Sequence, residues 1–296
     1  MKILVAGANG QVGWELGQQG AESAHDVITL GRDQLDICDA ESVKLRVQEN
    51  QPEIVINAAA YTAVDKAEEE RDAAFAINRD GAKNLAQACK DVSIPLLHIS
   101  TDYVFDGTKD NPYLESDPVA PLGVYGESKW AGEVAVKDTL DRCFILRTSW
   151  VFGIHGHNFV KTILRVAGER DELRVVSDQL GSPTSAHGIA SALLQICDHY
   201  SSNEVLPWGT YHYTGQPFTS WHGFAEAIVK LGRENGLIDH EVMIHPISTE
   251  EYPTPAKRPA NSRLSSELIQ SKLRIKPDDW QAALQSMIVT MARQDS

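Results

Sequence analysis

The sequence has few cysteines, few basic residues and no long apolar run, and each shortage excludes a class of protein. Its four cysteines, Cys38, Cys89, Cys143 and Cys197, are scattered among 296 residues with no C-x-x-C pair. This spacing argues against disulfide frameworks and zinc sites and favours free thiols in a reducing compartment. No apolar run approaches the ~18 residues of a membrane span, and the apolar start is too short for a secretory signal. We therefore expect a cytoplasmic protein with no membrane partner.

The shortage of basic residues bears on the partners that the protein can bind. The chain has 27 lysines and arginines against 41 aspartates and glutamates, a formal net charge of −14 at pH 7. A surface of that charge repels a phosphate backbone, so we expect no nucleic-acid partner. Hydrophobic residues make up 42% of the chain. This is enough apolar material for one large core or two modest ones.

The first half of the chain alternates short apolar runs with helical periodicity, which is typical of parallel strands joined by helical crossovers. The runs at 54–56 and 143–146 are continuously apolar, so helices should cover both faces of the sheet. We predict an α/β fold with a doubly wound parallel (Rossmann) sheet. The predicted strands are Lys2–Ala6, Asp26–Leu30, Glu53–Ala58, Pro95–Thr101 and Arg142–Ser149, and the predicted helices are Gln11–Gln19, Ala40–Glu49, Arg71–Asp91 and Tyr125–Leu140.

The pattern changes after residue 150, where segments rich in glycine, histidine and proline interrupt it. Strand-like runs at Leu173–Ser177 and Thr210–Tyr213 are expected to return to the central sheet. We predict a dinucleotide-binding domain of residues 1–150 plus roughly 173–213, and a smaller, discontinuous α/β substrate domain of roughly 151–172 and 214–296. Further helices are predicted at Phe159–Ala167, Ser185–His199, Trp221–Arg233 and Asp279–Met291.

A glycine-rich turn follows the first predicted strand and leads directly into a helix. Gly7, Gly10 and Gly13 have the spacing G-x-x-G-x-x-G, with Gln11 and Val12 at the predicted helix start. Glycine lets the chain turn sharply and approach a pyrophosphate, whose charge the helix N-terminus stabilises. A tight structural turn would also use glycine, but the flanking strand and helix favour dinucleotide binding. The spacing resembles that of the short-chain dehydrogenase/reductase class.

The residue after the second predicted strand indicates which dinucleotide binds. NAD sites of this kind usually place an acidic residue there for the ribose hydroxyls, whereas this chain has Gly31 and Arg32. An arginine suits a 2′-phosphate, so we expect NADPH as the preferred cofactor and NADH as a tolerated one. The alternative is that Arg32 is a solvated loop residue.

Three further residues form a candidate catalytic group. Tyr125 and Lys129 lie four residues apart, on one face of a predicted helix. A nearby ammonium favours the phenolate of a tyrosine, whose ordinary pKa is about 10, and so brings this proton donor closer to the working pH. Thr101 closes the fourth predicted strand, where its hydroxyl can donate to a substrate carbonyl oxygen. Either feature alone fits an ordinary helix surface or strand end, but together with the glycine turn they indicate an oxidoreductase site.

Six segments spread along the chain carry a more specific resemblance: Asn57–Glu68, Ser100–Gly107, Tyr125–Lys129, Arg147–Val151, Asp178–Thr184 and Arg258–Ser262. Together they resemble the dTDP-4-dehydrorhamnose reductases, which are extended short-chain dehydrogenase/reductases. The resemblance implies reduction of the C4 keto group of dTDP-4-dehydro-L-rhamnose to dTDP-L-rhamnose, the last step of dTDP-rhamnose synthesis for bacterial surface polysaccharides.

The resemblance also implies roles for single residues. Tyr125 would protonate the sugar oxygen as hydride reaches C4, with Lys129 as its partner. Thr101 and Asp102 match substrate contacts, and Trp150 resembles the aromatic residue that lines the sugar pocket. The remaining matches are Gly10, Gln11 and Val12 at the pyrophosphate, Asp36 and Ile37 at the adenine, Ala60, Tyr61 and Thr62 near the nicotinamide half, and Arg258 and Asn261 in either a clamp for the dTDP phosphates or a structural loop.

One departure from the family concerns a metal. Some members form a magnesium-bridged dimer through a glutamate equivalent to Glu15 and a second one in a later helix, where this chain has His187. A neutral imidazole is a poor ligand for magnesium, so we expect no metal site, and a homodimer stays open.

Two other functions remain as alternatives. Related nucleotide-sugar dehydratases and epimerases share the cofactor half, but dehydratases typically read Thr-Asp-Glu where this chain has Tyr103 after Asp102. The resemblance also extends to a non-catalytic NADP-binding regulatory subunit, against which the retention of Tyr125, Lys129 and Thr101 argues. Two motifs are given ordinary roles: His155-x-His157 in a loop, and the run Glu68-Glu69-Glu70 as the solvated start of a helix.

Overall fold

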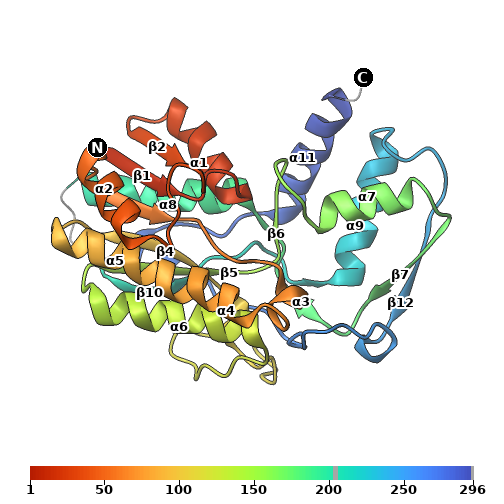
Figure 1. Ribbon diagram of the computed structural model, residues 1–296. Helices are drawn as coiled ribbons and strands as arrows, with labels where there is room; N and C mark the ends of the chain where they lie inside the picture. Colours follow the sequence, from red (N-terminus) through yellow and green to blue (C-terminus); the bar gives the residue numbers. More distant parts are fainter. Residues whose placement is uncertain (203–205, 295–296) are drawn as a thin grey trace.

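The computed structural model describes residues 1–202 and 206–294, and its centre is a parallel sheet. In this part of the chain the sheet has six strands, in the order β10-β5-β4-β3-β1-β2, and every neighbouring pair is parallel. The predicted doubly wound α/β fold is thus confirmed (Figure 1). The strands are β1 (Lys2–Ala6), β2 (Asp26–Leu30), β3 (Ile54–Asn57), β4 (Leu96–Thr101), β5 (Cys143–Thr148) and β10 (Gly209–His212).

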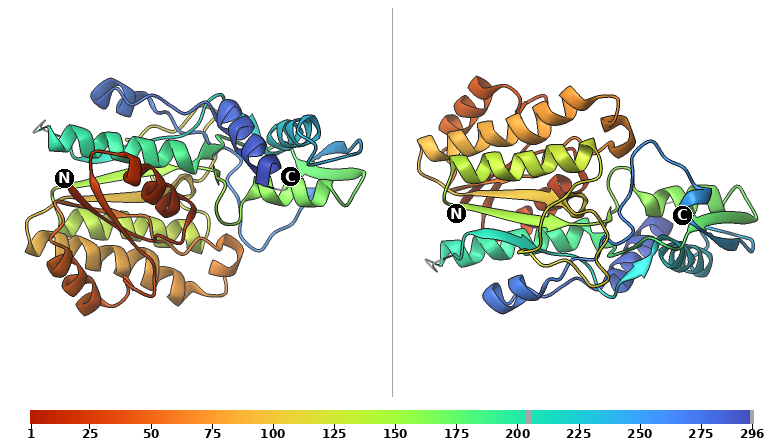
Figure 2. Two further views of the ribbon diagram at one scale, coloured as in Figure 1. Left: turned by 90° about the horizontal axis from the view of Figure 1, so that it is seen from above. Right: turned by 90° about the horizontal axis from the view of Figure 1, so that it is seen from below.

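Helices cover both faces of this sheet, as the continuously apolar strands require (Figure 2). Ile3 and Val5 of β1 belong to a core shared with α1 (Gln11–Glu22) and α8 (Ala186–Ser201). The alternate residue Leu4 belongs to the opposite core, under α2 (Ala40–Asn50), α5 (Ala82–Asp91) and α6 (Val124–Thr139). Successive residues of a strand face opposite sides, so each buries its own helical layer.

The strand order reverses beside β1, and this positions the site. The chain passes from β1 to β2 on one side and then to β3 on the other side. The loops that follow β1 and β3 therefore diverge, which opens a crevice at the carboxyl ends of these strands.

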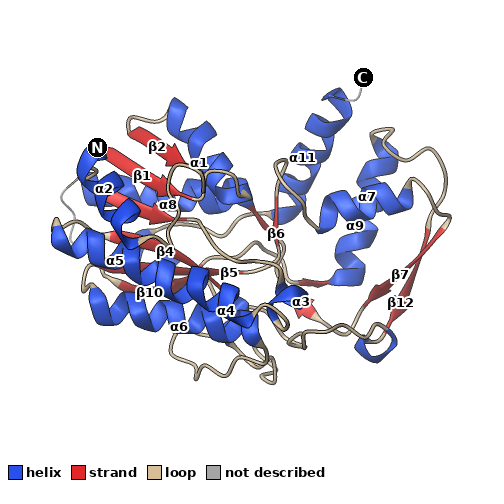
Figure 3. Cartoon of the chain, in the orientation of Figure 1, coloured by secondary structure: helices blue, strands red, loops and turns tan. Residues whose placement is uncertain are grey.

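A second lobe packs around its own core, which includes Phe152, Leu164, Phe224 and Trp280. In Figure 3 this lobe lies to the right of the sheet, with its helices and its small sheet in view. Its elements are α7 (Phe159–Ala167), β7 (Glu172–Val176), α9 (Trp221–Glu234), β12 (Met243–Ile247) and α11 (Trp280–Gln294).

The shorter elements of the described chain are α3 (Val64–Ala67), α4 (Arg71–Phe75), β6 (Val151–Phe152), β8 (Leu180–Gly181), β9 (Thr184–Ser185), β11 (Thr219–Ser220), α10 (Glu267–Leu273) and three short turns of other helix types at Ala76–Gly81, Asp102–Val104 and Thr249–Glu251.

One strand prediction for the second half is confirmed and one is wrong. β10 joins the central sheet beside β5. β7 instead pairs with β12 in a two-stranded sheet of the second lobe, because a partner strand that the sequence pattern did not reveal lies there. α10 packs into the core of the central sheet, through Ile269 and Leu273. The predicted division of the chain into two domains stays a prediction. The pairing of β7 with β12 and the packing of α10 on the central sheet both bear on where its boundaries lie.

None of the helices in the described residues is both long enough and apolar enough to cross a membrane.

Candidate active site

A cleft of about 760 Å³ runs along the carboxyl ends of β1, β3, β4 and β5. Most of the residues predicted to bind cofactor or substrate line it, although they come from six separate stretches of sequence. The predicted residues in its wall are Gly7, Gly10, Gln11, Val12, Arg32, Asp36, Ile37, Ala60, Thr62, Thr101, Asp102, Tyr125, Lys129 and Trp150. The predicted residues outside its wall are Gly13, Tyr61, Arg258 and Asn261.

The glycine turn needs its glycines for steric reasons. Gly7 has φ +98°, a region that favours glycine, and an added Cβ would lie 2.5 Å from the Ala59 nitrogen. A Cβ on Gly13 would lie 2.1 Å from the Gly7 oxygen, so this residue packs α1 against the turn from behind. The N–H groups of Gln11 and Val12 precede the first intrahelical bond, which runs from Trp14 N to Gly10 O. They have no partner within the helix and suit a phosphate group.

Arg32, Asp36 and Ile37 form the end of the cleft beside β2. The Arg32 side chain is 73% exposed and its Nε lies 3.5 Å from Asp36 Oδ2. A hydrogen bond from the Cys38 N–H, together with the Arg32 charge, holds the pKa of Asp36 below its usual value. An exposed pair of this kind is weak, so the guanidinium remains available to an anionic ligand.

Tyr61 is not part of the cleft wall, and its side chain is bonded elsewhere. Its hydroxyl donates to Glu70 Oε2 at 2.7 Å, and its N–H donates to Asn78 Oδ1 at 2.8 Å. Its neighbours Ala60 and Thr62 do line the cleft. Tyr61 therefore anchors the loop that presents the other two.

Tyr125 and Lys129 lie in the first two turns of α6, facing Thr101 at the end of β4. Burial raises the pKa of Tyr125 to about 12, against the lowering effect of a hydrogen bond with Thr101. This direction is opposite to the lowering expected from Lys129, because the phenol is buried. Burial lowers the pKa of Lys129 to about 8, against the opposite effect of Glu133. Lys129 Nζ donates to the Ile99 carbonyl at 2.6 Å, which fixes the ammonium beside β4. All three residues thus line the same cleft, with Tyr125 in hydrogen-bond contact with Thr101.

Asp102 and Trp150 form the wall towards the second lobe. Burial raises the pKa of Asp102 to about 6, although hydrogen bonds from Ser262 and Thr101 oppose this. Trp150 stacks on Trp221, with ring centroids 3.6 Å apart. Its indole lies over Gly181, where a Cβ would come within 2.3 Å. The second lobe therefore supplies a fixed aromatic surface to the cleft.

Arg258 is held by an ion pair outside the cleft wall. Its Nη1 and Nη2 donate to the two carboxylate oxygens of Asp65 at 3.1 and 2.8 Å. This bidentate geometry is typical of strong arginine–carboxylate pairs. Of the two roles left open for Arg258, the contacts in the structure are those of an anchor for its loop.

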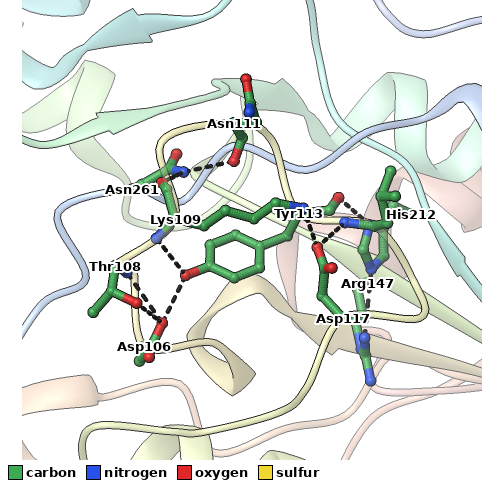
Figure 4. A network of polar contacts seen from close by, with 10 residues as sticks. Asp106, Thr108, Lys109, Asn111, Tyr113, Asp117, Arg147, His212 and Asn261 are labelled. Atoms are coloured by element: carbon green, nitrogen blue, oxygen red, sulfur yellow. Dashed lines mark hydrogen bonds and ion pairs between the residues drawn. The ribbon is translucent and has the colours of Figure 1, made fainter.

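Asn261 also makes structural contacts. Its Nδ2 donates to the carbonyls of Lys109 and Asn111, at 2.5 and 3.0 Å. Figure 4 shows these bonds beside Tyr113, whose hydroxyl donates to Asp106 at 2.7 Å. The side chain therefore ties the segment after Asn261 to the loop that follows β4, at a distance from the cleft wall.

A buried network that no sequence motif indicates lies one turn after Lys129 on α6. Glu133, in this turn, accepts hydrogen bonds from Arg147 Nε at 2.8 Å and Arg147 Nη2 at 2.7 Å. The Ser100 hydroxyl donates to the same carboxylate at 2.6 Å. These side chains are almost fully buried. Only the topology brings them together, since they come from β4, β5 and α6.

The loop 153–158 was also given no role beyond that of a loop, and it lies across the glycine turn. His155 Nε2 lies 3.1 Å from the Asn9 carbonyl oxygen, and its ring stacks on Trp14. Asn158 Nδ2 donates to Gln11 Oε1 at 3.0 Å. His157 lines the cleft itself. The second lobe therefore contacts the predicted pyrophosphate site directly.

A family model described as the RmlD substrate binding domain matches residues 1–293 of this chain. A dTDP-4-dehydrorhamnose reductase of Burkholderia thailandensis is 45% identical over 294 residues, which cover 96% of this chain and 97% of that protein. The chain belongs to the dTDP-4-dehydrorhamnose reductase family.

Solved structures of this reductase family have the same fold. A dTDP-4-dehydrorhamnose reductase of Clostridium acetobutylicum superposes with a TM-score of 0.91 at 40% identity, over 98% of this chain and 99% of that one. The enzyme of Bacillus anthracis in complex with NADP gives a TM-score of 0.89 at 37% identity, with the same coverage.

The residues at the expected family magnesium position do not fit that ion. Glu15 and His187 do come together, with Oε2 of Glu15 3.3 Å from Nδ1 of His187. The hydrogen bond with Glu15 raises the pKa of His187, so the pair tends towards an imidazolium–carboxylate contact. A cation that requires oxygen ligands finds one carboxylate here and a competing positive charge. Among residues 1–202 and 206–294, no cluster of three or more His, Cys, Asp or Glu is arranged to hold a metal ion.

Proposed function

We propose that this protein reduces the C4 keto group of dTDP-4-dehydro-L-rhamnose to the alcohol of dTDP-L-rhamnose, with NADPH as the reductant. The observation that carries this proposal is the meeting of Tyr125, Lys129 and Thr101 in the cleft that begins at the glycine turn. Relatives named dTDP-4-dehydrorhamnose reductase also match almost the whole chain, which supports the proposal.

When bound, the reduced nicotinamide supplies the hydride that forms the new C–H bond at C4. Tyr125 gives its phenolic proton to the former ketone oxygen, which forms the O–H bond of the alcohol. With its pKa raised to about 12, Tyr125 carries this proton at neutral pH. The Thr101 hydroxyl, which donates to Asp102 Oδ1 at 3.0 Å in the structure, turns to donate to the same oxygen while negative charge develops on it.

Lys129 stabilises the phenolate that remains after the transfer. Its ammonium lies one turn from Tyr125 in a buried site, where a positive charge acts more strongly than in water. Solvent then returns the proton to Tyr125 before the next turnover.

The proposed cofactor site combines the glycine turn with the loops after β2 and β3. We assign the pyrophosphate to the N-terminus of α1 and the 2′-phosphate to Arg32, with NADH tolerated at lower efficiency.

Replacing Arg32 by Ala should reduce kcat/KM with NADPH and leave kcat/KM with NADH unchanged. Equal kcat/KM values for the two cofactors in the parent would contradict the assignment. The proposed cofactor residues are Gly7, Gly10, Gln11, Val12, Gly13, Arg32, Asp36, Ile37, Ala60, Thr62, Tyr125 and Lys129.

The proposed substrate site lies on the side of the second lobe. Thr101 and Asp102 face the reacting sugar, and Trp150 offers its stacked indole to the sugar ring. Arg258 and Asn261 would act on substrate only through the loop that they anchor.

The loss of NADPH absorbance with dTDP-4-dehydro-L-rhamnose tests the activity. We expect turnover by the parent and a loss of at least a hundredfold in kcat for Tyr125→Phe, since the proton donor is gone. Tyr200→Phe is the matched control, because Tyr200 lies near the C-terminal end of α8, outside the cleft wall, and should leave kcat close to that of the parent. A parent that binds NADPH without turnover would instead favour a binding protein.

Compartment and assembly belong to the same proposal. All four cysteines are free thiols, which fits a protein of the reducing cytoplasm. We propose that any homodimer forms without magnesium. EDTA should therefore leave both the elution volume in size-exclusion chromatography and the activity unchanged, and dissociation by EDTA would contradict this.

A further inference from the structure

The segment that follows β3 reaches the start of the helix that carries the proposed catalytic tyrosine. Glu68 Oε1 accepts a hydrogen bond from the Val124 N–H at 3.0 Å. Arg71 Nη1 lies 2.8 Å from Glu127 Oε2, and Asn78 Nδ2 donates to the Ser128 hydroxyl at 2.9 Å. Three side chains of residues 68–78 thus contact the first two turns of α6.

Glu68 has the most direct of these contacts, since it caps the helix. The residue at the N-cap of α6 is Gly123, which has no side chain to satisfy the first N–H groups. A carboxylate from another segment takes this place and complements the helix dipole. A Cβ on Gly123 would lie 2.5 Å from Glu68 Oε1, so the glycine leaves the room that the carboxylate requires.

The capped N–H belongs to the residue directly before Tyr125. In the first turn of a helix no intrahelical bond fixes the N–H groups, so the external bond decides how firmly the backbone of this turn is held. The phenol of Tyr125 must stay within hydrogen-bond reach of the substrate oxygen and of Thr101. A misplacement of about 1 Å at such a group reduces the rate by large factors.

We propose that Glu68 is a positioning residue for Tyr125. Its carboxylate holds the first turn of α6 in the geometry required for proton transfer. This inference rests on the proposed reduction, in which Tyr125 is the proton donor. The sequence predicted that the acidic run 68–70 is the solvated start of a helix, and it does precede α4 directly. Its first member also caps another helix, far along the chain.

Three variants at two positions test the bond. Glu68 and Glu69 are both exposed, so no buried gap is created. Glu68→Ala should lower kcat about tenfold, with the KM for the sugar nucleotide and the Kd for NADPH within about twofold of the parent. Glu68→Gln should keep at least half of the parent kcat, since an amide oxygen accepts the same hydrogen bond. Glu69→Ala, which removes the neighbouring acid, should leave all three constants unchanged.

Each outcome decides the inference separately from the proposed function. No turnover by the parent would overturn the proposed function. A parent that turns over, with Glu68→Ala equally active, would overturn the positioning role alone. The role would also be overturned if Glu68→Gln lost as much kcat as Glu68→Ala, or if the Kd for NADPH rose in proportion to the loss of kcat, because charge or general loosening would then be responsible.

Discussion

At the scale of single residues, burial acts in opposite directions on the two titrating members of the site. It raises the pKa of Tyr125 to about 12, which keeps the proton on the donor, and lowers the pKa of Lys129 to about 8. The lysine is therefore the group of the pair that changes its charge nearest to neutral pH. Thr101 is uncharged and contributes through hydrogen bonds alone. Substitution of Thr101 can therefore separate its role from those of Tyr125 and Lys129.

Replacing Thr101 by Val should lower kcat about a hundredfold. The side chain keeps its shape but loses the hydroxyl that donates to the developing oxyanion, and removal of one such donor typically has an effect of this size. Thr101→Ser, which retains the hydroxyl, should stay within a few fold of the parent. Steady-state kinetics with saturating NADPH measure both variants, and a loss of equal size in Thr101→Ser would indicate packing of the methyl group instead.

The pH dependence should report the charge of Lys129. As pH rises through about 8, Lys129 in the free enzyme loses its proton and no longer stabilises the phenolate, while Tyr125 stays protonated. We therefore expect kcat/KM for reduction to fall above about pH 8. Lys129→Arg keeps its charge at any accessible pH, so it should lack this alkaline limb even if its activity is lower. If kcat/KM of Lys129→Arg still falls above about pH 8, a group other than Lys129 causes that fall.

At the scale of elements, the sequence predicted well those segments whose pattern depends on local periodicity. β1, β2 and α7 have the bounds that were expected, because a glycine directly follows each apolar segment. The expected helix over 71–91 contains a π-helical turn, Ala76–Gly81, where Asn78 turns inward to bond Tyr61 and Ser128. That distortion depends on tertiary partners, which no local pattern records.

The same distinction applies to the site. Gly7 and Tyr125 could be predicted because each belongs to a motif whose spacing is itself the requirement. The orientation of the Tyr61 side chain could not be predicted from the sequence, since it depends on Glu70 and Asn78. Glu133 could not be found at all, because its partners come from strands 33 and 14 residues away in the sequence.

The ion pair between α3 and the segment before α10 permits a test of the role of Arg258. Arg258 and Asp65 are 24% and 41% exposed in their side chains, so we expect a coupling of about 1 kcal/mol in the free energy of unfolding. Asp65→Ala, Arg258→Ala and the double variant, measured by urea denaturation, give this value. If Arg258 acts only as an anchor, the double variant should have the same KM for the sugar nucleotide as Arg258→Ala. A KM that rises for Arg258→Ala but not for Asp65→Ala would instead support a phosphate clamp.

At the scale of the whole molecule, a net charge of −14 coexists with a site for two anionic ligands. The structure reconciles them by concentrating positive potential in the cleft, through the N-terminus of α1, Arg32 and Lys129. The excess of acid excludes a long phosphate polymer without weakening a cleft that surrounds small pyrophosphates.

The buried histidines should make the whole fold sensitive to acid. Burial lowers the pKa of His212 to about 3 and that of His98 well below its usual value. In the unfolded chain a histidine binds a proton near pH 6.5, so below that pH the unfolded state binds more protons and stability falls until the folded pKa is reached. Asp102, whose pKa is raised to about 6, acts in the opposite sense between its unfolded value and pH 6. Three further groups have raised pKa values and oppose the two histidines, but they are less buried than His98 and His212: Glu115, His187 and His240.

We therefore expect the free energy of unfolding, measured by urea denaturation, to fall between pH 7.5 and pH 5.5. His212 alone should contribute a loss of roughly 1 to 1.5 kcal/mol over this interval. His212→Gln should be less stable than the parent at pH 7.5, because the contacts of His212 with Tyr113 and Arg147 are altered, yet it should lose less stability on acidification. His245→Gln, at a side chain that is 44% exposed, should lose as much as the parent. An equal loss in His212→Gln would mean that other groups cause the acid sensitivity.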